Sequence, residues 1–244
     1  MKNLSMADNL IIAMWSGPRN LSTALMRSIA NRDDVTKVLD EPFYASYLKN
    51  TNKSHPMRDE VIKSQLCDID EVKNLCQKPD TGLTYQKHMT QHILDEDFKW
   101  MNKLKNCFLI RHPKMVVKSF MKSWSKGDFE DIGFNQQYQI YKYIINNIDQ
   151  CPPILDATKI RNNPKKILKK FCEVIDIPWD EKMLTWEPGL KEYDGIWASH
   201  WYPSVAKSTS FNPETNVEIK LGDKEKRIVD KAMPIYEELL TNSI

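Results

Sequence analysis

Residues 10–31 read LIIAMWSGPRNLSTALMRSIAN, a short apolar run, then a polar loop, then a helical pattern. The run is typical of a buried strand, and the pattern after the loop predicts an amphipathic helix that begins near Arg19, Ser22 and Thr23. Backbone N–H groups at a helix start have no partner within the helix and carry the positive end of its dipole, so we expect an anion cradle here. The alternative is a plain helix start, with Ser and Thr as caps and Arg19 on the surface.

Similar apolar runs recur along the chain and alternate with helical patterns, which predicts parallel strands joined by crossover helices. The expected strands are residues 10–15, 35–39, 83–86, 107–110 and 154–157. Ligands of such sheets bind beyond the carboxyl ends of the strands. The polar residues expected at that edge are an anion-binding loop, acids, and cationic or titratable groups: residues 17–23, Asp40, Glu41, Lys87, His88, Arg111 and Thr158.

Length and composition limit the class of protein. A chain of 244 residues without a Pro/Gly/Ser-rich linker is expected to form one domain, residues 1–244. The formal net charge of +2 argues against nucleic acid as the main partner. Five cysteines without a C-x-x-C pair argue against disulfide scaffolding and structural zinc, and no apolar run is long enough for a membrane span. We therefore expect a cytoplasmic protein that binds a small molecule.

The motif G-x-x-x-x-G-K-[ST] is absent, so an ordinary ATP or GTP loop is not expected. Instead, SGPRNLSTALMRSI resembles the 5′-phosphosulfate loop of sulfotransferases that use 3′-phosphoadenosine 5′-phosphosulfate (PAPS). The resemblance implies a three-layer, P-loop-like fold and assigns a run of residues to PAPS binding: Gly17, Pro18, Arg19, Asn20, Leu21, Ser22 and Thr23. Asn20 and Leu21 depart from the Ser-Gly pair of the family pattern.

A second motif, FLIRHPKMVVKSF, resembles the segment that binds the 3′-phosphate in these enzymes. Arg111 ends the expected strand, and Ser119 follows eight positions later on the next helix. The resemblance implies that both bind the nucleotide, whereas a structural salt bridge for Arg111 and a neutral helix position for Ser119 are the alternatives. The functional interpretation requires Arg19 and Arg111 to converge on one cavity, where they would hold opposite ends of the same nucleotide.

Two residues are candidates for the general base that deprotonates an attacking hydroxyl. LDEPF resembles the family segment that carries a catalytic glutamate, which points to Glu41. YQKHM resembles the strand that ends in a catalytic histidine, which points to His88, with Lys87 contacting the transferred group; His92 is a weaker candidate. Side chains alternate along a strand, so only one of Lys87 and His88 can face the crevice.

The resemblance covers residues 10–180, the expected nucleotide-binding core, and leaves residues 181–244 as an aromatic loop and a C-terminal helix. Within them, residues 184–211 are rich in Trp and Tyr, which indicates loop packing or, as the alternative, a cover for adenine or the acceptor. Lys207 is expected near the 3′-phosphate because the family has a basic loop there.

The sequence thus predicts a transferase that moves a sulfuryl group from PAPS to a hydroxyl, or an amine, of a small acceptor, with no metal, nucleic acid or membrane partner. An atypical phosphotransferase that uses Asp40 to bind magnesium and a nucleotide-binding protein without catalysis are the alternatives.

Overall fold

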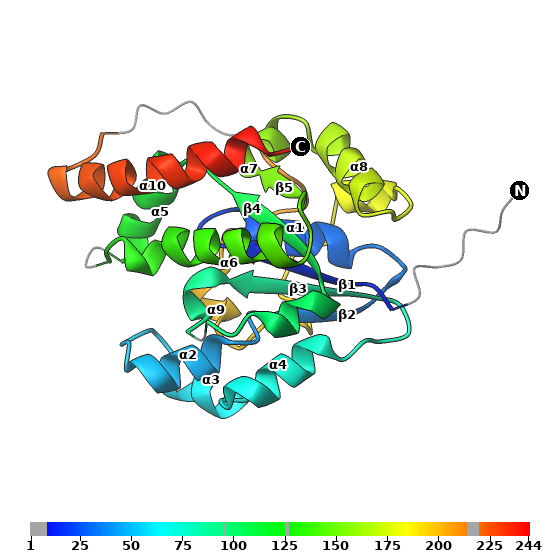
Figure 1. The fold of residues 1–244 in the computed structure, drawn as a ribbon, viewed down its shortest axis with the longest axis horizontal. Coiled ribbons are helices and arrows are strands. Elements are labelled where there is room, and N and C mark those ends of the chain that lie inside the picture. The colour runs from blue at the N-terminus through cyan, green and yellow to red at the C-terminus, as the bar shows by residue number, and fades with distance from the viewer. Residues whose placement is uncertain (1–8, 95, 125–126, 214–219) are drawn as a thin grey trace, which may run out of the picture.

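A computed structural model describes residues 9–94, 96–124, 127–213 and 220–244, so the first eight residues of the expected domain lie outside it. Five parallel strands form one sheet in the order β2-β3-β1-β4-β5 (Figure 1). The strands are β1 (Ile11–Ser16), β2 (Val35–Asp40), β3 (Leu83–Met89), β4 (Lys105–Ile110) and β5 (Ile154–Asp156). All five predicted strands are confirmed, with ends displaced by at most three residues.

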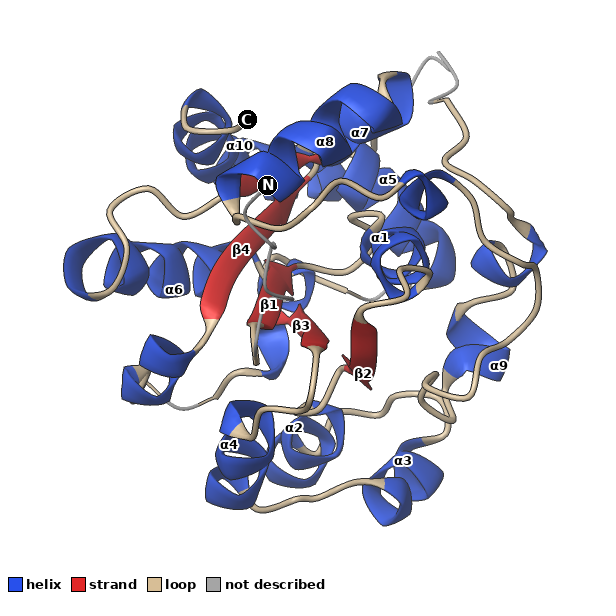
Figure 2. Cartoon of the chain, turned by 90° about the vertical axis from the view of Figure 1, so that its right-hand side faces the viewer, coloured by secondary structure: helices blue, strands red, loops and turns tan. Residues whose placement is uncertain are grey.

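Helices cover both faces of the sheet, which confirms the predicted three-layer α/β fold (Figures 1 and 2). One face packs against α1 (Ser22–Ala30), α2 (Tyr44–Thr51), α3 (Arg58–Ser64), α7 (Ala157–Asn162), α8 (Pro164–Val174) and α9 (Ala198–Trp201). The other face packs against α4 (Ile69–Gln77), α5 (Pro113–Ser123), α6 (Phe134–Asn147) and α10 (Asp223–Thr241). The shorter helical turns are η1 (Thr90–His92), η2 (Lys99–Lys103), η3 (Glu130–Ile132), η4 (Glu181–Leu184) and η5 (Val205–Lys207).

The alternation of side chains along β1 explains the two cores. Ile12 and Met14 pack on the α1 side, whereas Ala13 and Trp15 pack on the α6 side. All are buried, because a parallel strand with helices on both faces has no solvated side. None of the helices in the described part of the chain is long and apolar enough to span a bilayer.

The strand order creates the place for a ligand. From β1 the chain moves to β2 and β3 on one side, and then crosses to β4 and β5 on the other. Connections that leave in opposite directions open a crevice at the carboxyl ends of the strands, where ligands of such sheets bind. The register pairs Asp40 of β2 with Lys87 of β3, so residues 47 positions apart become direct neighbours at this edge.

Residues 184–211 pack over the α1 face. The Arg27 guanidinium in α1 donates two hydrogen bonds, of 2.6 and 2.5 Å, to the Asp194 carboxylate, and the Tyr193 ring lies 5.2 Å from the same guanidinium. The side chains of Arg27 and Asp194 are both almost fully buried. These contacts fit loop packing, one of the two interpretations of this aromatic segment.

Candidate active site

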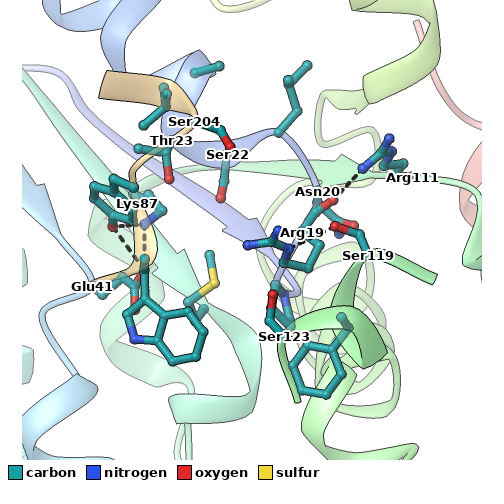
Figure 3. Close-up of a pocket in the computed structure, with 18 of the residues that line it drawn as sticks. Arg19, Asn20, Ser22, Thr23, Glu41, Lys87, Arg111, Ser119, Ser123 and Ser204 are labelled. Carbon is teal, nitrogen blue, oxygen red and sulfur yellow. Dashed lines mark hydrogen bonds and ion pairs between the residues drawn. The ribbon is translucent and has the colours of Figure 1, made fainter. Parts of the chain in front are cut away.

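A cleft of about 840 Å³ lies at the carboxyl edge of the sheet. Figure 3 shows Glu41 and Lys87 on one side, Arg111 and Ser119 on the other, and Arg19 between them. The loop after β1 and the start of α1 also contribute to its lining: Pro18, Asn20, Leu21, Ser22 and Thr23. A cavity of this size is within the ordinary range for small-ligand sites, about 300–1,000 Å³.

The loop after β1 has an unusual backbone. Arg19 and Leu21 are left-handed, with φ of 64° and 72°, although neither is glycine. Such conformations cost roughly 1–3 kcal/mol each and are found mainly at functional sites. Leu21 is also the N-cap of α1, and no side chain of the described residues caps that helix start. Its first N–H groups are therefore available to an anion.

Two residues of the loop have structural roles. Asn20 is buried, and its side-chain amide donates a hydrogen bond of 3.4 Å to the Leu109 carbonyl of β4, which fastens the loop to the sheet. Gly17 does not line the cleft. A Cβ at Gly17 would lie 2.3 Å from the Ile132 carbonyl oxygen, so glycine is needed for this close approach of two backbones. The proposed contact of Gly17 with the nucleotide has no support from its position.

We expect Gly17→Ala to lower the free energy of unfolding by about 1–3 kcal/mol, because the added methyl group forces the loop away from Ile132. Chemical denaturation measures this effect. A free energy of unfolding within about 0.5 kcal/mol of that of the unmodified chain would contradict the steric role of Gly17.

Arg19, Arg111 and Ser119 form one contact group, although they lie far apart in the sequence. Arg19 Nε donates to Ser119 Oγ at 2.9 Å, and Arg111 Nη1 donates to the Arg19 carbonyl at 2.9 Å. The two arginines therefore do meet in one cleft, as the interpretation of the motifs requires. Burial, together with the charge of Arg111, lowers the pKa of Arg19. Because a bound anion would offset this like-charge repulsion, the group is suited to phosphate.

The opposite side of the cleft holds two acids around one lysine. Lys87 Nζ donates to Asp40 Oδ1 at 2.9 Å, to Glu41 Oε1 at 2.5 Å and to the Tyr202 hydroxyl at 2.5 Å. Burial alone would lower the pKa of Lys87, but the two carboxylates raise it, so the ammonium stays charged. All three of its N–H groups have acceptors. A sulfuryl oxygen could bind Lys87 only if one of these bonds were exchanged.

The two acids have different surroundings. Asp40 accepts hydrogen bonds from Lys87, from Tyr202 and from the Gly195 backbone N–H at 3.1 Å, and it does not line the cleft. Glu41 lines the cleft, and its second carboxylate oxygen accepts no hydrogen bond from the described residues. Glu41 is therefore the acid that can meet a ligand.

The backbone and the pKa of Glu41 are also unusual. Its φ of 48° is left-handed, and this conformation is held by hydrogen bonds from Glu41 N–H to the Lys87 carbonyl at 2.9 Å and from Tyr44 N–H to the Glu41 carbonyl at 3.0 Å. Burial raises the pKa of Glu41, and Lys87 opposes this rise only in part. A buried acid with a raised pKa in a cleft is typical of a general base or acid.

Tyr202 was not predicted as a site residue. Its hydroxyl lies 2.8 Å from Asp40 Oδ2 and 3.2 Å from Glu41 Oε1, and it accepts a hydrogen bond of 3.1 Å from Trp197 Nε1. The aromatic segment thus adds a hydroxyl to the acid cluster as well as packing on the fold. In the sequence, the only feature that pointed to this segment was its richness in Trp and Tyr, which did not distinguish Tyr202 from the other aromatic residues.

The structure does not bring His88 or Lys207 to the cleft. His88 faces the other core, where its ring stacks on Trp15 at 4.2 Å and Nε2 bonds to Gln86 Oε1 at 2.9 Å. The predicted alternation of Lys87 and His88 is confirmed, and Lys87 is the residue that faces the cleft. Lys207 is exposed on η5, whereas Ser208 and Ser210 line the cleft beside it. His92 does line the cleft, with Nδ1 3.9 Å from Glu41 Oε2.

Comparisons with known proteins agree with this fold. A family model described as a sulfotransferase domain matches residues 10–243. The branched-chain-amino-acid aminotransferase-like proteins 2 and 1 of Arabidopsis thaliana are 33% and 32% identical over 229 and 234 residues, which is 93% and 95% of this chain. The chain spans only 40% and 42% of these two relatives. A crystal structure of a sulfotransferase from Alicyclobacillus acidocaldarius has the same fold, with a TM-score of 0.55, 10% identity, and coverage of 97% of this chain and 96% of that one.

Proposed function

Because the chain belongs to the sulfotransferase domain family, we propose that it transfers a sulfuryl group from PAPS to a hydroxyl, or an amine, of a small molecule. The observation that carries this proposal is the arrangement of the cleft. Arg111 and Ser119, in contact with Arg19, lie on the side of the cleft opposite the acid Glu41, and their donors suit a phosphate (Figure 3). The single domain and the cytoplasmic location stay predictions.

The cleft offers donors for both phosphorylated ends of such a nucleotide. The open start of α1, with Ser22, Thr23 and Arg19, would hold the 5′-phosphosulfate and stabilise the charge that grows on the leaving phosphate. Arg111 and Ser119 would hold the 3′-phosphate. PAPS supplies the sulfuryl group itself. Within the described residues, no cluster of three potential metal ligands stands near these donors.

Glu41 would act as the base. In the transfer, a bond forms between the acceptor oxygen and sulfur, the bond from sulfur to the 5′-phosphate oxygen breaks, and the hydroxyl proton moves to Glu41. Lys87 holds the Glu41 carboxylate through its bond to Oε1, which leaves the other oxygen for the acceptor. Asp40 and Tyr202 in turn keep the Lys87 ammonium in place.

The test measures transfer of labelled sulfate from PAPS to a panel of alcohols, phenols and amines, together with release of adenosine 3′,5′-bisphosphate. Turnover that is unaffected by EDTA is expected. Turnover of ATP that requires magnesium would instead indicate the phosphotransferase alternative. Tight binding of adenosine 3′,5′-bisphosphate without transfer to any acceptor would indicate a nucleotide-binding protein without catalysis.

We expect Arg111→Met to weaken binding of adenosine 3′,5′-bisphosphate by about 10- to 100-fold, because charge-assisted hydrogen bonds to a phosphate are lost. Isothermal calorimetry measures the effect. Affinity for adenosine 5′-phosphate, which lacks the 3′-phosphate, should change much less. An equal loss for both nucleotides would show that Arg111 does not bind the 3′-phosphate. Lys114→Met, an exposed position on α5 three residues after Arg111, is the matched control.

A further inference from the structure

The wall of the cleft that begins beside Glu41 is made of stacked rings. The His92 ring lies next to the Glu41 carboxylate and stacks on two tyrosines of α2. The ring centroids are 4.6 Å apart for Tyr44, with parallel planes, and 4.7 Å apart for Tyr47. All three aromatic side chains are buried and line the cleft. The rings therefore pack against one another beside the Glu41 carboxylate.

The wall continues toward the rim of the cleft. The Tyr44 hydroxyl shares a hydrogen bond of 2.8 Å with His55 Nδ1, and the His55 ring meets the edge of Trp124 with centroids 4.6 Å apart. Trp124 follows α5 and is only partly buried, so part of its indole faces the cleft. We call these residues the aromatic wall: Tyr44, Tyr47, His55, His92 and Trp124.

The titratable rings of the aromatic wall are neutral near pH 7. Burial lowers the pKa of His55 to about 4 and holds the pKa of His92 well below its usual value. Burial also raises the pKa values of Tyr44 and Tyr47, so neither phenol ionises. The wall thus offers apolar ring surface and no positive charge.

The charged groups beside the aromatic wall are acids or paired ions. Asp131, at the rim, pairs with Lys53 at 2.7 Å, and this hydrogen bond lowers the pKa of Asp131 against the effect of burial. Lys87 is covered by its three acceptors. The other Lys and Arg side chains among the described lining residues are Arg19, Arg111, Lys122 and Arg161. Arg19 lies in the loop after β1, Arg111 directly follows β4, Lys122 is in α5, and Arg161 is in α7.

The cleft is therefore polarised. Lys122 stands one turn after Ser119 on α5, so it belongs with the phosphate-binding end, where the nucleotide's own negative charges are expected. Near the aromatic wall, three acids (Asp40, Glu41 and Asp131) share two lysines (Lys87 and Lys53), so acids outnumber cations beside the neutral rings. An anionic group there would approach carboxylates in a medium that screens charge weakly, whereas a cation would meet carboxylates and ring faces.

Resting on the proposed function, we propose that the aromatic wall binds the acceptor, and that this acceptor is a hydroxyl compound with a flat apolar body and no negative charge. The body packs on Trp124 and the stacked rings, and the hydroxyl points to Glu41. A positive charge on the acceptor is accommodated by the excess of acids over lysines and by the ring faces. Selection against anions comes from repulsion, which separates similar ligands more sharply than apolar contact alone.

The test compares three phenols of similar shape and different charge: tyramine, 4-ethylphenol and 3-(4-hydroxyphenyl)propionate. Their dissociation constants are measured with the full chain saturated with adenosine 3′,5′-bisphosphate. We expect the cationic and neutral compounds to bind at least about 10-fold more tightly than the anion. Equal or tighter binding of the anion overturns the inference. Sulfate transfer to the same compounds is measured separately. If the three phenols bind in the expected order but none receives sulfate, the result contradicts the proposed function and not the inference about the acceptor.

A pair of variants locates the binding surface. Trp124→Ala should weaken binding of 4-ethylphenol by about 10-fold, while affinity for adenosine 3′,5′-bisphosphate stays unchanged. Trp179→Ala is the matched control, because Trp179 does not line the cleft. If both variants bind 4-ethylphenol like the unmodified chain, the aromatic wall is not the acceptor site.

Discussion

Glu41→Gln is expected to lower kcat for sulfate transfer by about 1,000-fold, within the range of about 10²–10⁴ for removal of a general base. The substitution keeps the shape of the side chain and removes its capacity to take a proton. Affinity for adenosine 3′,5′-bisphosphate should be preserved, because Glu41 lies on the opposite side of the cleft from Arg111 (Figure 3). Single-turnover transfer of labelled sulfate, with nucleotide affinity measured in parallel, is the experiment.

His88→Ala provides the contrast. His88 is buried away from the cleft, so its loss should affect stability and not the chemical step. We expect kcat per nucleotide-binding molecule to change by less than about 10-fold. If His88→Ala abolishes transfer in molecules that still bind adenosine 3′,5′-bisphosphate, while Glu41→Gln remains active, the assignment of the base is wrong.

The raised pKa of Glu41 adds a pH dependence with a definite sign. Transfer requires the ionised carboxylate, so kcat should fall as the pH falls through the pKa of folded Glu41, above the usual range for glutamate. Because the folded state disfavours the ionised form, this group destabilises the protein above that pKa. Glu41→Gln, which resembles the protonated acid, should therefore raise the melting temperature at neutral pH. An unchanged or lower melting temperature would contradict the raised pKa.

Lys87→Met is expected to lower kcat by about 1,000-fold or more, because it changes the site in two ways. Asp40 and Glu41 lose the ammonium that lies within 2.9 Å of both, so repulsion between the acids raises the pKa of Glu41 further. The carboxylate also loses the hydrogen bond that orients it toward the acceptor. Removal of one oriented donor from an active site already costs about 10²–10³ in kcat.

The measurement is a pH profile of kcat for Lys87→Met beside that of the unmodified chain. The acid limb should move to higher pH, and part of the lost activity should return in alkaline buffer. Lys118→Met is the control, because Lys118 is exposed on α5 and does not line the cleft. A uniform loss of activity without a shift of the acid limb would mean that Lys87 does not set the pKa of Glu41.

Local patterns in the sequence were enough to predict the fold class and several of the residues that line the cleft. Apolar runs of the right length are confirmed as β1 to β5, because burial between two helical layers requires continuous apolar side chains. Arg19 and Arg111 were found because each follows a predictable strand. The alternation of Lys87 and His88 was predicted from strand geometry, but which of the two faces the cleft was not, because that depends on the layer against which β3 packs.

The sequence by itself determined which segments are strands and helices, and that a loop and a helix start follow the first strand, since these features depend on neighbouring residues. Only the tertiary structure decided the strand order, the burial of His88 and the place of Tyr202. Tyr202 lies 162 positions from Asp40, and its hydroxyl reaches that acid because the aromatic segment packs over α1 and is held there by Arg27 and Asp194. Contacts of this kind arise from the packing of distant segments, which no local pattern encodes.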